Sequence, residues 1–137
     1  MSSQARGLLI SLMLITILFS LAGCRRVADT RAEFCQTLRP VGALAVELKS
    51  INADTPADQL RAKVESLQQA KSTLERLAKL TPIPAIDELS SSIDQVVQAA
   101  SQATGNTLGP AAEQIGIAGM QLDQVYAQVN DAACAAK

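Results

Sequence analysis

Three cysteines, Cys24, Cys35 and Cys134, are the residues of this 137-residue chain whose type and spacing most clearly suggest chemistry. The chain has no histidine, and it therefore lacks the base of Ser-His-Asp and Cys-His catalytic arrangements. Zinc sites with Cys/His ligands and histidine-ligated haem are excluded for the same reason. The cysteines are therefore candidates for covalent modification and disulfide bonding rather than for catalysis.

Carboxylates are the remaining candidates for catalysis or metal binding. Asp87, Glu88 and Asp94 fall within two turns of one predicted helix. Acids at this spacing usually form a solvated helical face, whereas a functional site also needs a cleft and perturbed titration. We therefore predict no catalytic residue, no metal ligand and no cofactor, and we expect that the protein is not an enzyme.

The segment before Cys24 has the layout of a secretory signal peptide. Arg6 stands in a short region without acids, an apolar run follows from Gly7 to Ser20, and the small residues Ala22 and Gly23 come directly before the cysteine. A basic region, an apolar core of about 7–15 residues and small residues before the cut are the marks of such a peptide.

The four residues Leu21-Ala22-Gly23-Cys24 resemble the lipobox of bacterial lipoproteins. The resemblance implies that the Cys24 thiol is lipidated, that the chain is cut between Gly23 and Cys24, and that lipid anchors the mature protein to a membrane. In this family an Asp directly after the cysteine can signal retention in the inner membrane. Since Arg25 stands there, the expected location is the outer membrane of a two-membraned bacterium, or otherwise the outer face of the cell membrane.

Two other interpretations of residues 1–24 remain open. Gly7–Gly23 is a stretch of 17 mostly apolar residues, at the short end of the length that spans a bilayer as a helix. An uncleaved signal-anchor is therefore one alternative, and a cleaved peptide without lipidation is the other. In all three cases the rest of the chain lies outside the cytoplasm.

Composition points to one helical domain. Removal of residues 1–23 would leave 114 residues with 11 basic and 13 acidic side chains, a net charge of −2. This length suits a single domain with a modest core, and the charge lacks the basic stripe of a nucleic-acid-binding protein. Phe34 and Tyr126 would be the aromatic residues left, too few for a platform that stacks bases or sugars. Ala, Leu, Gln, Glu and Lys dominate, which favours an all-α fold.

Apolar residues recur at helical spacing in four segments, at about 29–51, 56–80, 84–103 and 110–133. Short turns between them predict an antiparallel up-down-up-down four-helix bundle. The domains are then a signal peptide at 1–23, a lipidated tether at 24–28 and a helical bundle at 29–137. The expected buried faces are Val27, Phe34, Leu38, Val41, Ala45 and Leu48; Leu60, Val64, Leu67, Ala70, Leu74 and Leu77; Ile86, Leu89, Ile93, Val96 and Ala100; and Ala111, Ile115, Ala118, Leu122, Val125, Val129 and Ala132.

Proline positions make two local predictions. Pro40 lies inside the first apolar stripe and removes one backbone donor there. Because the stripe continues in phase beyond it, we expect a kink in the helix rather than a break. Thr55 stands directly before Pro56, and we expect its side chain to cap the second helix.

With Cys24 modified, Cys35 and Cys134 form an even pair in an exported domain, which favours a disulfide. In an up-down-up-down bundle the start of the first helix and the end of the fourth lie at the same end. By helical phase Cys134 points away from the core, so the last turn has to fray or bend for the sulfurs to meet. Pairing between two chains is the alternative. Phe34-Cys35 and Cys134 around a helical core are also similar to small exported helical bacterial proteins of unknown function, a resemblance that implies no activity.

Charge and small residues suggest two surface features. Residues 24–80 carry a net charge of +3 and residues 81–137 a net charge of −5. The simpler interpretation is that the two helical hairpins attract one another, and a dipolar surface for a partner is the alternative. Ala112, Gly116 and Gly119 form a patch of small residues that permits close helix approach, either within the bundle or with a partner helix.

The expected function is that of a non-enzymatic binding or structural module of the cell envelope, held at the membrane through lipid on Cys24. Its partner would be an envelope protein or an apolar ligand, and not a nucleic acid. The alternative function is a carrier that holds a small apolar ligand or lipid between the helices of an Ala-rich core.

Overall fold

The computed structural model describes the backbone of residues 3–135 and the side chains of residues 26–135. Its elements are four α-helices: α1 (Ser3–Lys49), α2 (Ala57–Ala78), α3 (Ile86–Ser101) and α4 (Ala111–Ala133). Residues 3–135 contain no β-strand, only one isolated bridge between two turns. The predicted all-α class is confirmed.

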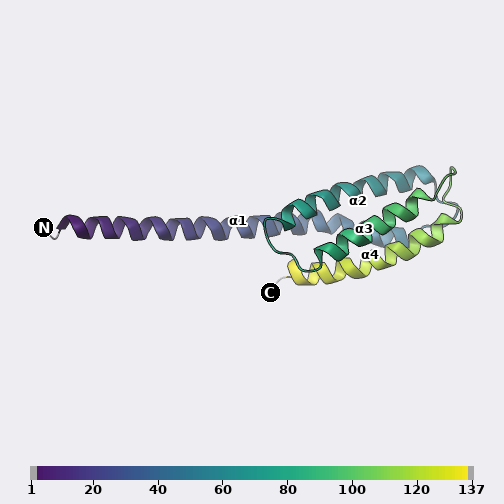
Figure 1. Ribbon diagram of the computed structural model, residues 1–137. Helices are drawn as coiled ribbons and strands as arrows, with labels where there is room; N and C mark the ends of the chain where they lie inside the picture. The colour runs from purple at the N-terminus through teal and green to yellow at the C-terminus, as the bar shows by residue number, and fades with distance from the viewer. Residues whose placement is uncertain (1–2, 136–137) are drawn as a thin grey trace.

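The helices pack as a bundle in which each contacts two others. Helix α1 packs against α2 and α4, and α3 packs against the same two helices. Figure 1 shows the four helices side by side, with the first half of α1 extending away from the other three as a single rod. The core therefore lies between the four inner faces and not along the whole of α1.

Leucines at heptad spacing form the α2 side of the core. Leu60, Leu67 and Leu74 repeat every seven residues, and all three are buried. They face buried residues from the other helices: Phe34, Leu38, Val41, Ala45 and Leu48 of α1, Leu89, Ile93 and Val96 of α3, and Ile115, Leu122 and Val129 of α4. The apolar periodicity thus identified the buried face of every helix.

Helix α1 begins earlier than the apolar pattern suggested. It starts at Ser3 rather than near Asp29, so the predicted tether at residues 24–28 lies inside it. From Arg25 to Arg39 the sequence has neither Gly nor Pro, and nothing local ends the helix there. The helix also continues through Pro40 without a break. Val27, expected on the buried face, is 49% exposed, because this part of α1 precedes the bundle.

The α1–α2 and α3–α4 connections are joined to one another by backbone hydrogen bonds. The Ala57 N–H donates to Asn106 O at 2.8 Å, the Leu108 N–H to Thr55 O at 3.0 Å, and the Gly109 N–H to Ala53 O at 3.0 Å. Leu108 is buried beneath this contact. Both connections therefore lie at one end of the bundle and hold each other in place.

Thr55 does not cap α2, and that prediction was wrong. The cap position is occupied by Pro56, with no side-chain hydrogen bond to the helix. The Thr55 hydroxyl instead accepts a hydrogen bond from the Asn52 N–H at 3.0 Å. The backbone of Thr55 is committed to the neighbouring turn, since its carbonyl accepts from Leu108, and its side chain closes its own turn.

The α2–α3 connection, residues 79–85, lies at the opposite end of the bundle, next to the part of α1 that extends away (Figure 1). Thr81 and Ile83 are buried in it, whereas Leu80, Pro82 and Pro84 are exposed. The N–H groups of Leu80 and Thr81 both donate to Leu77 O, at 3.0 and 3.2 Å. The connection is thus tied to the end of α2 and packed into the core.

Candidate functional site

Cys35 and Cys134 form a disulfide between α1 and the end of α4. Their sulfurs are 2.11 Å apart and their Cα atoms 5.6 Å apart. Cys35 follows the fully buried Phe34, and both cysteines are half-buried against the core. The predicted pairing within one chain is therefore present, and it covalently joins the first helix to the last.

The end of α4 departs from helical geometry so that Cys134 reaches Cys35. Helix α4 ends at Ala133, and Cys134 has φ −122° and ψ −14°, outside the helical region. The N–H groups of Cys134 and Ala135 both donate to Asn130 O, at 2.8 and 2.9 Å. The bend that helical phase required in the last turn is confirmed. Ala132, which was expected on the buried face of this helix, is exposed, whereas Ala133 is buried.

The predicted lipidation and cleavage residues, Cys24 and Gly23, lie on the backbone of α1, but their side chains are outside the described residues. Cys24 is eleven residues before Cys35 on the same uninterrupted helix. The intervening side chains are mostly exposed, including Arg26, Val27 and Glu33. A helix of two to three turns, rather than a flexible linker, thus connects Cys24 to the bundle.

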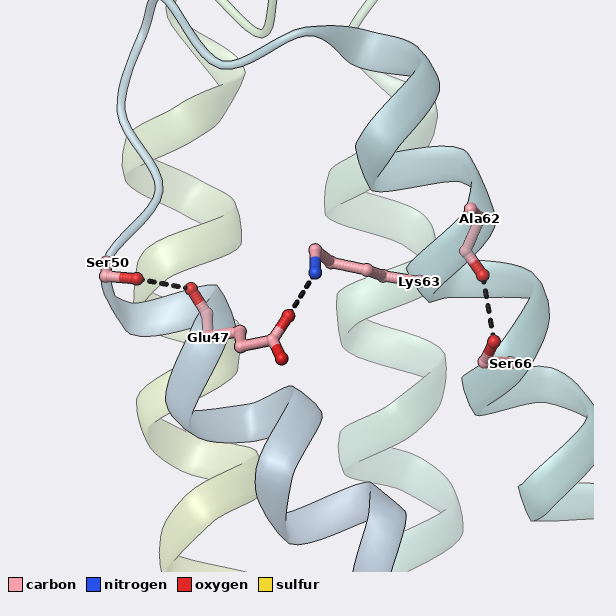
Figure 2. A network of polar contacts seen from close by, with 5 residues as sticks. All are labelled: Glu47, Ser50, Ala62, Lys63 and Ser66. Carbon is pink, nitrogen blue, oxygen red and sulfur yellow. Dashed lines mark hydrogen bonds and ion pairs between the residues drawn. The ribbon is translucent and has the colours of Figure 1, made fainter.

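Ion pairs link neighbouring helices around the bundle surface. Lys63 of α2 pairs with Glu47 of α1, and the Glu47 carbonyl also accepts a hydrogen bond from the Ser50 hydroxyl, as Figure 2 shows. Arg76 of α2 also contacts α1, with its Nη2 3.6 Å from Glu33 Oε1. These pairs are exposed or half-exposed, so each contributes little to stability, in the range of about 0–1 kcal/mol.

Two further ion pairs join the basic and acidic halves of the chain. Lys49 Nζ of α1 is 2.6 Å from Asp123 Oδ2 of α4. Lys71 Nζ of α2 is 2.6 Å from Asp94 Oδ1 of α3 and 3.8 Å from Glu75 Oε1. Both pairs match a cation from residues 24–80 with an acid from residues 81–137, which agrees with attraction between the two halves. Asp94, a candidate acid, therefore has a structural partner.

The pKa of Lys71 provides a test of the α2–α3 contact. The hydrogen bond to Asp94 raises the pKa of Lys71 above its ordinary 10.5, and desolvation partly offsets this effect. Because the folded-state pKa is the higher one, the stabilising contribution is complete below about 10.5 and is lost as pH rises through the folded-state value. We expect Asp94→Asn to lower the pKa of Lys71 toward its ordinary value, measured by NMR titration of the lysine Cε–H signals.

Glu75→Gln is the control for this titration, since Glu75 contributes less to the shift. We expect Glu75→Gln to lower the pKa of Lys71 by less than Asp94→Asn does. An unchanged Lys71 pKa in Asp94→Asn would contradict the contact.

The other candidate acids, Asp87 and Glu88, lie exposed in the first turn of α3. They line a shallow hollow of about 540 Å³ together with Ser91, Ser92 and glutamines of α3 and α4. Within the described residues, no three His, Cys, Asp or Glu side chains are placed so that they could hold a metal ion. The acids of α3 are thus dispersed on its surface, apart from the pair with Lys71.

Two hollows with apolar linings lie at the end of the bundle where the two connections meet. One, of about 400 Å³, lies between α2 and α3 and is lined mainly by Leu60, Val64, Val97 and Ala100. The other, of about 510 Å³, lies between the α1–α2 connection and α4 and includes Ile51, Ile117 and Met120. Both are open at the surface, and neither contains a histidine or a cysteine.

The small residues of α4 divide between the core and the surface. A Cβ atom at Gly119 would lie 2.7 Å from Leu48 Cβ and 3.3 Å from the Leu48 carbonyl carbon, so α1 approaches α4 closely there. A Cβ atom at Gly116 would meet nothing within 4 Å. Close packing within the bundle therefore explains Gly119, and Gly116 lines the open hollow beside Ile117 and Met120.

Comparison of the chain with protein-family models, with curated proteins and with solved structures found no match. Among the helical segments described in full, none is both long enough and apolar enough to cross a membrane.

Proposed function

We propose that this protein is an exported lipoprotein, cut between Gly23 and Cys24 and anchored by lipid on Cys24. Its bundle serves as a non-enzymatic binding or structural module of the cell envelope. The observation that carries the proposal is the Cys35–Cys134 disulfide directly downstream of the lipobox-like Leu21–Cys24 segment. Disulfides persist in oxidising compartments outside the cytoplasm, so two separate features of the chain support the same location.

An up-down-up-down topology is part of the proposal, and pairs of contacts along the helices support it. Glu47 pairs with Lys63, and Glu33, fourteen residues earlier in α1, pairs with Arg76, thirteen residues later in α2. Likewise Lys49 pairs with Asp123, whereas Cys35 is bonded to Cys134 farther along α4. In both cases residue numbers decrease along one helix while they increase along its neighbour, as they do in antiparallel helices.

A carrier of a small apolar ligand is the second candidate function. The hollow between α2 and α3 favours it, because Leu60, Val64, Val97 and Ala100 offer apolar surface in a space of about 400 Å³, which falls within the usual size of ligand sites. Extraction of the purified bundle with organic solvent tests this function. A stoichiometric lipid in the extract would favour the carrier, and its absence would favour the binding or structural module.

The anchor is tested by comparing the native chain with Cys24→Ser in the membrane fraction. For the native chain we expect an intact mass equal to residues 24–137 plus acyl chains, and two further alkylations only after reduction. Cys24→Ser is expected to lose the acyl mass and to leave the membrane fraction. Equal membrane retention of the variant, or a mass of residues 1–137 without lipid, would contradict lipid anchoring and favour an uncleaved signal-anchor.

A further inference from the structure

We propose that the α2–α3 connection rests on the membrane surface and inserts Leu80 into the headgroup layer of the bilayer. This inference depends on the proposed lipid anchor at Cys24 and adds a second membrane contact to it. It concerns residues 79–85, at the end of the bundle next to the extended part of α1 (Figure 1).

Leu80 is exposed although the backbone around it is hydrogen-bonded and two residues after it are buried. Its exposure therefore does not come from a loose connection. Its side chain is 65% exposed, whereas Thr81 and Ile83 on its C-terminal side are 3% and 7% exposed. Its N–H donates to Leu77 O at 3.0 Å, as does that of Thr81 at 3.2 Å. A leucine held outward in this way forgoes the ~1.5–3 kcal/mol that burial of its side chain would supply.

The distance between Leu80 and the anchor follows from one contact between α1 and α2. Arg76 Nη2 lies 3.6 Å from Glu33 Oε1, which places these two residues at one level along the bundle. Cys24 is nine residues before Glu33, and Leu80 is four residues after Arg76 on the antiparallel helix. At ~1.5 Å per residue, Cys24 and Leu80 lie ~13 and ~6 Å from that level in the same direction. Leu80 is thus ~7 Å farther from the membrane than Cys24 when α1 stands upright.

This offset matches the thickness of the headgroup layer. A bilayer of ~40–45 Å with a hydrocarbon core of ~30 Å has headgroup layers of ~5–7 Å each. With the Cys24 lipid at the boundary of the hydrocarbon core, Leu80 stands at the outer edge of the headgroups, and a tilt of α1 toward α2 inserts it. The helical connection between Cys24 and the bundle preserves this geometry, which a flexible linker would not.

Basic side chains do not outnumber acidic ones around Leu80, so the contact depends on the apolar side chain. The described charged residues at this end of the bundle include the cations Arg26, Arg31, Arg76 and Lys79, and the acids Asp29, Glu33, Glu75, Asp87, Glu88 and Asp131. Attraction to an anionic surface is therefore weak, and it is screened beyond ~8–10 Å at physiological salt. We accordingly expect the contact to occur on a zwitterionic bilayer and to be insensitive to salt.

A single tryptophan at position 80 tests the inference, because the chain contains none. Leu80→Trp and Val46→Trp form a matched pair, since Val46 is also exposed, at 55%, but lies far along α1 from Cys24. Each variant is purified from membranes and reconstituted in phosphatidylcholine vesicles with nitroxide-labelled or ordinary headgroups. For Leu80→Trp we expect emission at shorter wavelength than that of a solvent-exposed tryptophan and a loss of intensity on the nitroxide-labelled lipid, at low and high salt alike. For Val46→Trp we expect neither.

Intact mass of the reconstituted protein separates the two proposals. If the acyl mass is present and both variants emit equally on the two lipids, the membrane contact is overturned while the anchor stands. If Leu80→Trp emits at shorter wavelength without loss on the nitroxide-labelled lipid, a second copy of the chain covers position 80 and the membrane contact is again overturned. If the acyl mass is absent, the anchor is wrong and the inference fails with it.

Discussion

Replacement of both Cys35 and Cys134 by serine is expected to lower the free energy of unfolding by about 4 kcal/mol. The disulfide spans 99 residues of sequence, and closing a loop of ~100 residues restricts the unfolded chain by ~4.7 kcal/mol in the chain-entropy model. A domain of this size has only ~5–15 kcal/mol of stability. The loss would therefore be a large part of the total.

Urea unfolding followed by circular dichroism measures this effect. Reduction of the native chain should reproduce the low midpoint of the double variant, and reduction of the double variant should change nothing. Both cysteines are replaced together because a single replacement leaves a thiol that can pair between chains. Coincident midpoints for the native chain and the double variant would show that the disulfide does not stabilise the bundle.

Alanine at Gly116 and alanine at Gly119 are expected to change stability in opposite directions. At Gly116 an added Cβ meets nothing, so the variant should gain the roughly 1 kcal/mol by which Ala exceeds Gly in a helix. At Gly119 the Cβ would lie 2.7 Å from Leu48 Cβ. Helices α1 and α4 must then separate, at a cost of about 1–3 kcal/mol for an overpacked contact.

Both glycines lie in α4, so both alanine variants gain the same helix propensity. The difference between their free energies of unfolding therefore reports the packing against Leu48. We expect that difference to be about 1–3 kcal/mol in chemical unfolding. Equal midpoints for Gly116→Ala and Gly119→Ala would mean that α1 does not approach α4 at this point.

The helices and their buried faces could be predicted because apolar spacing is a local property of the sequence. Leu60, Leu67 and Leu74 repeat every seven residues and are all buried, as hydrophobic periodicity requires. The break predicted between residues 103 and 110, which contains Gly105 and Gly109, corresponds to the observed connection at residues 102–110. The same periodicity wrongly predicted that Val27 is buried. Val27 continues the apolar stripe of α1, but no helix among the described residues packs against this part of α1.

The contacts between the turns could not be predicted from local sequence. Thr55 has the sequence of a helix cap, but its backbone carbonyl binds Leu108, more than fifty residues away. This distant contact holds Thr55 in the turn, where its side chain closes the turn instead of capping α2. Hydrophobic periodicity does not reveal such a contact. The candidate site shows both situations. The number and positions of Cys35 and Cys134 favoured their pairing within one chain but left pairing between two chains open. The bend at Cys134 followed from helical phase, whereas the tie of two N–H groups to Asn130 did not.

The disulfide also determines how the protein would respond to mechanical load. A force applied between Cys24 and the end of α4 would pass along the part of α1 between Cys24 and Cys35 and then directly to Cys134. The 99 residues of separation between these cysteines, which extend by ~3.5 Å each when unfolded, would stay out of the path. Pulling would therefore lengthen the oxidised chain by only the short segment outside the bond. Reduction would let the same load unfold the bundle and lengthen the path by up to roughly 350 Å, so that a stiff attachment becomes an extensible one.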